Sequence, residues 1–327
     1  MNRRAIFLIA FAFLLIGQLP LAPLHAEQSE KLWRIGFLSL TKADSFHHAF
    51  FDGMRALGYR QGVGFIVESR FAAGDESRLP ALAAELARLP VDLIVARGTQ
   101  ATSAAKHATR TIPIVMTGTS DPVGTGLVTS LSRPGGNITG LSILAPDLAE
   151  KRLELLRRVV PRASVVGVLW NPTNAGNINE WEQTRRAAKS MKMTLVSREV
   201  RQPRDIEAAF ERNGPAPLDA VLTLTDALLT SGRGEIVRRT NSNRLPAIFH
   251  VRDFVEYGGM MSYGPDLHES FRRAAYYVDR ILKGTKPAQL PVEQPIKFEL
   301  AVNLRTAKQV NVMVPGDVLA SADRIIR

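Results

Sequence analysis

Residue types suited to binding a small charged molecule follow several apolar runs of this sequence. Asp226 comes directly after the apolar run 219–225, and its carboxylate could pair with an ammonium group. Residues 98–100 (GTQ) and 118–122 (GTSDP) follow two further apolar runs, and we expect each to open a helix. Backbone N–H groups and the positive end of a helix dipole would hold an anion such as a carboxylate there. These positions favour the binding of a zwitterion over bond-breaking chemistry.

The same residues also have plain structural explanations. Thr99, Ser120 and Asp121 could each serve only as the cap of a helix. Asp226 could equally cap a helix or stabilise a turn. The segment 171–174 (NPTN) supplies amide donors and acceptors, but Asn-Pro is also typical of a turn. The sequence leaves both explanations open at each of these positions.

Catalytic and metal-binding signatures are absent from the sequence. It contains no GxSxG, HExxH, GxGxxG or P-loop motif. Ser, His and Asp residues that are distant in sequence could still form a triad, but nothing singles out one histidine. His47 and His48 are adjacent on an expected helix, so their rings diverge and we expect a surface pair rather than a metal site. The absence of cysteine excludes disulfides, thiolate metal sites and a cysteine nucleophile, and we expect neither a metal nor a cofactor.

Alternating strand and helix patterns must position these residues. Short apolar runs alternate with amphipathic stretches, which is typical of doubly wound α/β sheets. The expected strands are 33–39, 64–71, 91–97, 112–117, 164–170, 193–200, 219–225 and 246–250, with 258–264 as a further candidate. The pattern repeats after the turn-rich stretch 134–140, which indicates two similar lobes of α/β structure. A helix over 266–283 and a strand over 297–303 remain, and such segments often cross back to an earlier lobe.

Ligands of open α/β sheets bind beyond the carboxyl ends of the strands. The residues just after the expected strands are therefore the candidates for a binding site. They are Ser39, Leu40, Thr99, Thr119, Ser120, Asp121, Asn171, Asn174, Asp226 and His250. An apolar part of a ligand would lie against groups such as Phe37, Leu40 or Phe249.

The first 26 residues are typical of a cleavable signal peptide. Arg3 and Arg4 precede an apolar stretch over 5–16, and the segment ends in the small residue Ala26. A retained membrane anchor is the weaker alternative, because that stretch is shorter than the roughly 20 residues that span a bilayer. The formal charge of +11 does not indicate a nucleic-acid partner, since the arginines are scattered singly or in pairs and export argues against it.

Several blocks of the sequence resemble the ABC-transporter substrate-binding protein family, in the group that includes tryptophan- and phenylalanine-binding members. The resemblance is carried by WRIGFLS, VDLIVARGTQAT, DPVGTGLVTSLSRPGGNITGLS, GGMMSYGPDL and PVEQPIKFELAVNLRTA. It implies the α/β fold of type I periplasmic binding proteins, with two Rossmann-like lobes, parallel sheets and three crossover segments. It further implies that 27–144 with 266–286 form one lobe and that 145–265 with 287–327 form the other. The hinges would lie at about 141–146, 262–266 and 284–296.

The resemblance also implies a role and a set of site residues. Thr99 and Ser120 would hold a carboxylate, Asp226 an α-ammonium group, and Asn171 and Asn174 would flank them. The chain would be a monomeric, periplasmic component of an importer, capturing a small solute such as an aromatic or branched amino acid for a membrane permease and its ATPase. An exported hydrolase or transferase, or a solute sensor on the same fold, are the alternatives.

Overall fold

The computed structural model describes residues 31–143, 145–211 and 217–327. The chain divides into Met1–Lys31 and one larger unit, Leu32–Arg327, and the account below concerns the larger unit. The predicted signal peptide lies outside the described residues. Among the described residues, no helix combines the length and hydrophobicity that a membrane crossing requires.

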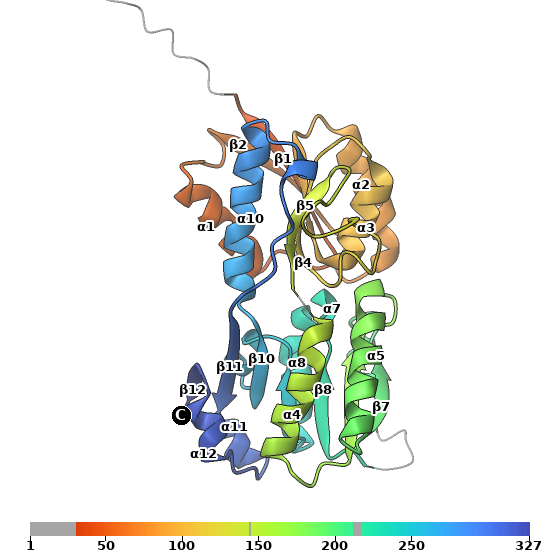
Figure 1. Ribbon diagram of the computed structural model, residues 1–327, viewed down its shortest axis with the longest axis vertical. Helices are drawn as coiled ribbons and strands as arrows, with labels where there is room; N and C mark the ends of the chain where they lie inside the picture. Colours follow the sequence, from red (N-terminus) through yellow and green to blue (C-terminus); the bar gives the residue numbers. More distant parts are fainter. Residues whose placement is uncertain (1–30, 144, 212–216) are drawn as a thin grey trace, which may run out of the picture. The chain divides into compact units, whose positions relative to one another are not determined.

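The first lobe is built on a five-stranded parallel sheet with the order β2-β1-β3-β4-β5. Its strands are β1 (Trp33–Ser39), β2 (Phe65–Phe71), β3 (Leu93–Arg97), β4 (Ile114–Thr119) and β5 (Ile138–Ser142). Helices α2 (Leu79–Arg88) and α3 (Gly98–Ala108) cover one face, and α1 (Ser45–Ala56) and α10 (Leu267–Leu282) cover the other (Figure 1). Every residue of β3 is buried, as expected for a strand that is covered on both faces.

Helices α1 and α10 pack closely because Gly53 has no side chain. A Cβ atom at Gly53 would lie 2.4 Å from the carbonyl oxygen of Arg272 on α10. The apolar face of α10, which includes Phe271, Ala274 and Val278, is buried in the same core. Although α10 lies between segments of the second lobe in the sequence, it therefore completes the first lobe.

The second lobe is built on a seven-stranded sheet with the order β12-β11-β10-β9-β8-β6-β7, parallel except for the antiparallel pair β10–β11. Its strands are β6 (Val165–Trp170), β7 (Thr194–Glu199), β8 (Ala220–Thr223), β9 (Ala247–Phe249), β10 (Met261–Pro265), β11 (Phe298–Asn303) and β12 (Arg324–Ile326). The helices are α4 (Ala149–Val159), α5 (Ala175–Ser190), α6 (Asp205–Ala208), α7 (Ala227–Ser231), α8 (Arg233–Ser242), α9 (Asp253–Glu256), α11 (Leu304–Gln309) and α12 (Gly316–Ala320).

Successive residues of β8 point to opposite faces of this sheet and join different cores. Leu222 packs in the cluster that contains Leu153 of α4, whereas Val221 packs in the cluster that contains Ile236 of α8. The cluster that contains Val221 and Ile236 also includes core residues of the first lobe, so the two lobes share buried apolar contacts.

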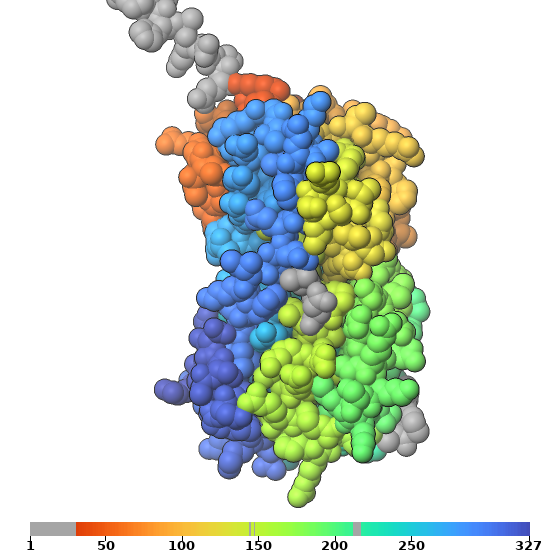
Figure 2. Space-filling model, in the orientation of Figure 1, coloured from red at the N-terminus to blue at the C-terminus, as the bar shows by residue number. Residues whose placement is uncertain are grey.

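Within the described residues, the chain passes between the lobes between β5 and α4, between β10 and α10, and between the 3-10 helix Pro287–Gln289 and β11. Figure 2 shows the last of these segments at the surface of the face in view. Residues up to 293 still belong to the edge of the first sheet: Leu290 accepts a hydrogen bond from Thr139, and Glu293 pairs with Leu141 of β5. The predicted boundary at residue 287, where the chain was expected to re-enter the second lobe, is therefore too early in the sequence.

The α/β architecture with two lobes is confirmed, but three local expectations were wrong. The stretch 134–140 was expected to be a turn, yet strand β5 begins at Ile138. Residues 118–122 open no helix, because Gly118 and Asp121 have positive φ angles of 62° and 41° and the chain turns instead. His47 is only 9% exposed and packs edge-on against Phe37, so it does not form a surface pair with the exposed His48.

Candidate functional site

The strand orders define where a ligand would bind in each lobe. In the order β2-β1-β3-β4-β5, the chain adds β2 on one side of β1 and then β3 on the other, so the direction of strand addition switches between β1 and β3. In the order β7-β6-β8-β9-β10 it switches in the same way between β6 and β8. Ligands of doubly wound sheets bind at such reversal points, beyond the carboxyl ends of the strands. Residues 98–100 follow β3, while Asn174 follows β6 and Asp226 follows β8.

These segments meet in one pocket between the lobes, which we call the inner pocket. It has a free volume of about 30 Å³, room for about one water molecule. The first lobe and the start of α10 contribute Arg97, Gly98, Thr99, Gln100, Gly118, Ile143, Leu267 and Phe271, and the second lobe contributes Asn174, Thr225, Asp226, Ala227 and Thr230.

Asp226 is 3% exposed and uses its two carboxylate oxygens differently. Its Oδ1 accepts hydrogen bonds from the backbone N–H groups of Leu228 and Leu229 and so caps α7. Its Oδ2 accepts a 2.8 Å hydrogen bond from Asn174 and a long, 3.5 Å contact from Gln100 of the other lobe. Burial raises the pKa of Asp226, although the hydrogen bonds from Asn174 and from the backbone oppose that rise. The cap fixes the carboxylate, and Oδ2 remains directed at the pocket.

A buried polar network holds the segment before Asp226. The side chains of Arg152 and Glu180 are both fully buried and form a 2.6 Å ion pair. Glu180 accepts hydrogen bonds from the backbone N–H and the hydroxyl of Thr225, at 2.9 and 3.0 Å. Asn177 donates to the Thr225 carbonyl at 2.8 Å. Thr225 is thereby bonded through three of its polar groups, which determines where the next residue points.

Arg97 brings a positive charge to the same pocket from the first lobe. Its side chain is 5% exposed, and its Nη1 donates a 2.8 Å hydrogen bond to Asp44. The guanidinium carbon lies 5.1 Å from the centre of the Phe46 ring and 5.5 Å from that of Phe271, within cation–π range. A guanidinium has five N–H donors, and Asp44 is the hydrogen-bond acceptor found for it among the described residues. Arg97 can therefore donate to a further anion in the pocket.

Direct contacts between the lobes surround this pocket. The Thr173 hydroxyl donates to Glu76 of the first lobe, and Asn179 donates to Asp121 at 2.8 Å. A Cβ atom at Gly176, in the first turn of α5, would lie 2.6 Å from the Cβ atom of Ser120. The cleft is closed in this structure, and α5 can approach the first lobe only because residue 176 is glycine.

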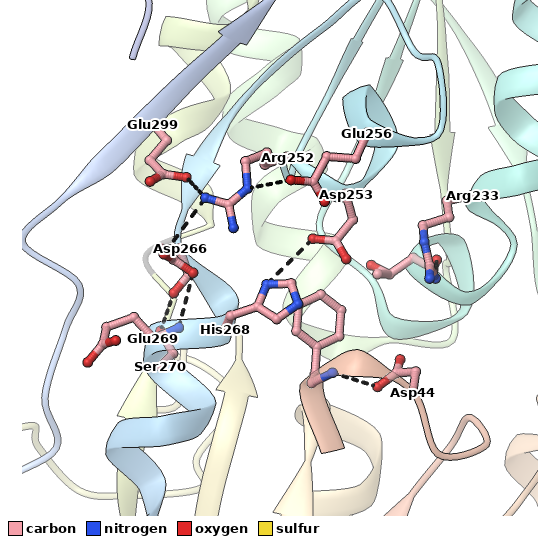
Figure 3. Close-up of polar contacts among 12 residues, drawn as sticks. Asp44, Arg233, Arg252, Asp253, Glu256, Asp266, His268, Glu269, Ser270 and Glu299 are labelled. Atoms are coloured by element: carbon pink, nitrogen blue, oxygen red, sulfur yellow. Dashed lines mark hydrogen bonds and ion pairs between the residues drawn. The ribbon is translucent and has the colours of Figure 1, made fainter. Parts of the chain in front are cut away.

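A second group of contacts lies beside the crossover segments (Figure 3). Arg252 forms ion pairs with Glu299 of β11, Glu256 of α9 and, at 3.8 Å, Asp266 at the start of α10. The other bridging contact joins His268 of α10 to Asp253 of the second lobe at 3.9 Å. Arg252 thus links the second lobe to the crossover before α10, and it also holds β11, the strand that follows another crossover.

Three of the predicted site residues line the inner pocket, namely Thr99, Asn174 and Asp226. Thr99 does not cap α3, whose N-cap position is Arg97; instead its hydroxyl accepts a 3.2 Å hydrogen bond from the Ser120 backbone N–H. Asn174 caps α5 with its Oδ1 and donates from its Nδ2 to Asp226. Asn174 therefore has both a structural role and a place in the pocket.

The other predicted residues lie around the pocket rather than on its wall. Asn171 holds the turn before α5, and Asp121 accepts a hydrogen bond from the Gly124 N–H as well as from Asn179. The remaining buried side chains pair with neighbours or pack in the core: Ser39 with Thr41, Thr119 with Thr102, Leu40 in the first-lobe core, and Ser120 against Gly176.

His250 and the proposed apolar wall need correction. Hydrogen bonds at 2.9 Å to Thr223 and at 2.8 Å to Thr230 occupy both ring nitrogens of His250, and burial lowers its pKa. Phe37 and Phe249 are fully buried in the core and do not reach the pocket. Ile143, Leu267 and Phe271 form the apolar part of its wall instead.

Sequence reasoning missed Arg97, Gln100 and the start of α10. The signal for Arg97 was a basic residue at the end of an otherwise apolar strand, since LIVAR contains no other charge. Gln100 lies in the same segment 98–100, but its side chain was not among the predicted site residues. Within the described residues, no group of three or more His, Cys, Asp or Glu side chains could hold a metal ion.

Comparison with known proteins gives consistent matches over most of the chain. The sequence profile of the family described as ABC transporter substrate binding protein matches residues 35–326. A tyrosine-binding protein of Clostridioides difficile is 27% identical over 288 residues, which cover 87% of this chain and 82% of the relative.

Two solved structures are similar in both fold and sequence. A conserved domain protein from Vibrio cholerae has a TM-score of 0.84 and 28% identity, with 90% of this chain and 100% of that chain covered. An ABC domain from Streptococcus pneumoniae in complex with L-Trp has a TM-score of 0.82 and 25% identity, over the same shares of the two chains.

Proposed function

Because the chain belongs to the ABC transporter substrate binding protein family, we propose that its solute is an α-amino acid bound between the two lobes. One observation carries this proposal: Arg97 and Asp226, of opposite charge, line the same buried pocket from different lobes. An α-amino acid carries the matching pair of charges on two groups attached to the same carbon atom. The tyrosine-binding relative and the L-Trp complex support the same class of ligand.

Each charged group of the ligand has a partner of suitable chemistry. The Arg97 guanidinium would donate hydrogen bonds to the ligand carboxylate, assisted by the backbone at the start of α3. Oδ2 of Asp226 would accept from the ligand ammonium group. The 3.5 Å contact from Gln100 is long for a hydrogen bond, so an ammonium group can displace it at little cost.

Capture would proceed by closure of the lobes around the ligand. A ligand that contacts both lobes favours the closed state by the difference between its affinities for the closed and open states. Rotation would take place at the three crossover segments, which is a common form of hinge motion in binding proteins. The contacts Thr173–Glu76 and Asn179–Asp121 would break on opening and re-form on closure.

We further propose that the chain is a binding protein without catalytic activity. In its inner pocket the titratable groups are held by structural contacts: Arg97 by Asp44, and Asp226 by the cap of α7. Residues 1–26 would direct export, and the mature protein would act as a monomer outside the cytoplasm. It would deliver its solute to a membrane permease driven by an ATPase.

The first test is to identify what the protein binds. Small molecules released by denaturing the purified protein are analysed by mass spectrometry, and the refolded protein is then screened with the amino acids by thermal shift. We expect one or more amino acids to be released and to raise the melting temperature on return. If no amino acid stabilises the protein, the proposed ligand class is wrong.

A further inference from the structure

A second, larger cavity adjoins the inner pocket, and we call it the outer groove. It has a volume of about 520 Å³, and its lining residues come mainly from α2, α3 and the start of α5. Most of its wall is formed by small and apolar side chains, namely Leu79, Pro80, Ala84, Ser103, Ala104 and Ala108, and His107 of α3 also lines it. Glu76 of the first lobe and Thr173 and Ala175 of the second line its lower end.

The two cavities share two residues, Thr99 and Gln100. Gln100 is 7% exposed and contacts the Asp226 carboxylate on the inner side. It also lines the outer groove beside Glu76, whose carboxyl has its pKa raised by burial. The Gln100 side chain therefore lies between the site for the charged groups and the outer groove.

The volumes decide where a ligand side chain can fit while the lobes are closed. A benzene ring occupies an apolar cavity of about 150 Å³. The inner pocket, at about 30 Å³, must widen even to admit the charged groups of the ligand and has no room for such a ring, whereas the outer groove, at about 520 Å³, is large enough. The groove also has the predominantly apolar lining that an apolar side chain requires.

We propose that the outer groove holds the side chain of the bound amino acid, and that Gln100 determines which side chains can enter it. This inference rests on the proposed function. The charged groups of the ligand lie between Arg97 and Asp226, and its side chain passes Gln100 to lie between α2 and α3. Ala84, Ala104 and Ala108 leave the space that it fills.

Filling the groove tests the inference. Ala104→Trp places a bulky ring in the groove without changing a charged group, and Ala81→Trp, on the exposed face of α2, is the matched control. Calorimetry with alanine, leucine, tyrosine and tryptophan measures the affinities of both variants and of the wild type. We expect Ala104→Trp to weaken the amino acids with large side chains at least tenfold, and to leave the smallest amino acid that the wild type binds within threefold. Ala81→Trp should leave every affinity unchanged.

Gln100→Ala supplies the second measurement. Removing the side chain should raise the affinity for large relative to small side chains at least fivefold, whatever the change in overall affinity. The inference is overturned if Ala104→Trp weakens all ligands equally or none, if Gln100→Ala leaves the ratio unchanged, or if the wild type binds only alanine. If the wild type binds no amino acid, the proposed function itself has failed, and that result precedes any use of the variants.

Discussion

Arg97 and Asp226 lie 129 positions apart in the sequence and line one buried pocket from opposite lobes. Each is fixed by its own structural partner, Arg97 by Asp44 and Asp226 by the first turn of α7. Their charges are therefore held in position before a ligand arrives. Such preorganisation lowers the conformational entropy that binding would otherwise cost.

Removal of the Asp226 charge should weaken an amino-acid ligand. Asp226→Asn keeps the shape of the side chain but loses a charged hydrogen bond, worth about 1.5–3 kcal/mol. We expect the affinity to fall about tenfold to a hundredfold by calorimetry. The same ligand without its amino group should bind the variant and the wild type alike. Unchanged affinity for the complete amino acid would remove Asp226 from the site.

Arg97 should recognise the carboxylate by its geometry as well as by its charge. Arg97→Lys keeps a cation but loses the planar fork of donors, so we expect a drop in affinity of about tenfold. The amide of the ligand should bind the variant and the wild type with similar affinities. Urea unfolding serves as a control, because Arg97→Lys also alters the contact with Asp44. A variant that is equally stable and binds normally would contradict the proposed role.

Closure should depend on the absence of a side chain at residue 176. Gly176→Ala would place a Cβ atom 2.6 Å from that of Ser120, and overpacking of this kind costs about 1–3 kcal/mol. Because the contact exists only between closed lobes, we expect ligand affinity to fall about tenfold or more with little change in stability. Gly316→Ala is the matched control, since no atom lies within 4 Å of a Cβ there. Equal ligand affinities for Gly176→Ala and Gly316→Ala would show that the close approach of residue 176 to Ser120 does not limit closure.

Ligand affinity should fall on acidification. In the closed, ligand-free state burial raises the pKa of Asp226 from its ordinary value of 3.8, so the carboxyl takes up a proton at a higher pH than an exposed aspartate does. The ammonium group of the ligand requires the ionised form, and protonation therefore competes with binding. We expect calorimetry to show affinity falling already above pH 3.8, and Asp226→Asn to reduce this dependence. A wild-type affinity that is constant down to pH 4 would contradict this linkage.

His47 should make the fold less stable in mild acid. Burial, and then the neighbouring His48, lower the pKa of His47 from 6.5 to about 4, and its ring nitrogens have no hydrogen-bond partner among the described residues. Between these pH values the unfolded chain binds a proton that the folded chain does not, so the free energy of unfolding decreases as pH falls from 6.5 to 4. Allowing for partial solvent screening, we expect a loss of roughly 2 kcal/mol.

Urea unfolding at several pH values measures this loss. His47→Phe should retain the packing against Phe37 and Phe51 and flatten the dependence on pH. His107→Gln, at an exposed position of α3, should leave that dependence as it is. If the free energy of unfolding depends on pH equally in the wild type and in His47→Phe, His47 does not explain the loss of stability.

The sequence predicted the sheets well because local pattern determines most of them. The LIVAR and VVGVLW runs, apolar except for Arg97, are typical of strands covered on both faces, and both form strands. Asp226 and Asn174 could be found because each lies just beyond such a strand. The second lobe also repeats the strand order of the first, so one rule about sheet edges applies to both.

The remaining errors arise from contacts that are distant in the sequence. The role of Arg97 depends on Asp44, Phe46 and Phe271, and its position as the last residue of a strand gives no sign of them. The absence of a helix after Gly118 follows from Asp121, which binds the Gly124 N–H and closes a turn. Phe37 and Phe249 were expected to lie against an apolar part of the ligand, but both side chains are fully buried in the core.

The most direct test compares one amino acid with two of its own analogues. Calorimetry on the ligand-free wild type measures the tightest-binding amino acid, its amide and the same acid without the amino group. If Arg97 and Asp226 hold the two charged groups, each analogue should bind at least tenfold more weakly than the amino acid. If either analogue binds as tightly as the amino acid, the charge it lacks is not recognised, and the proposed pairing across the cleft is wrong.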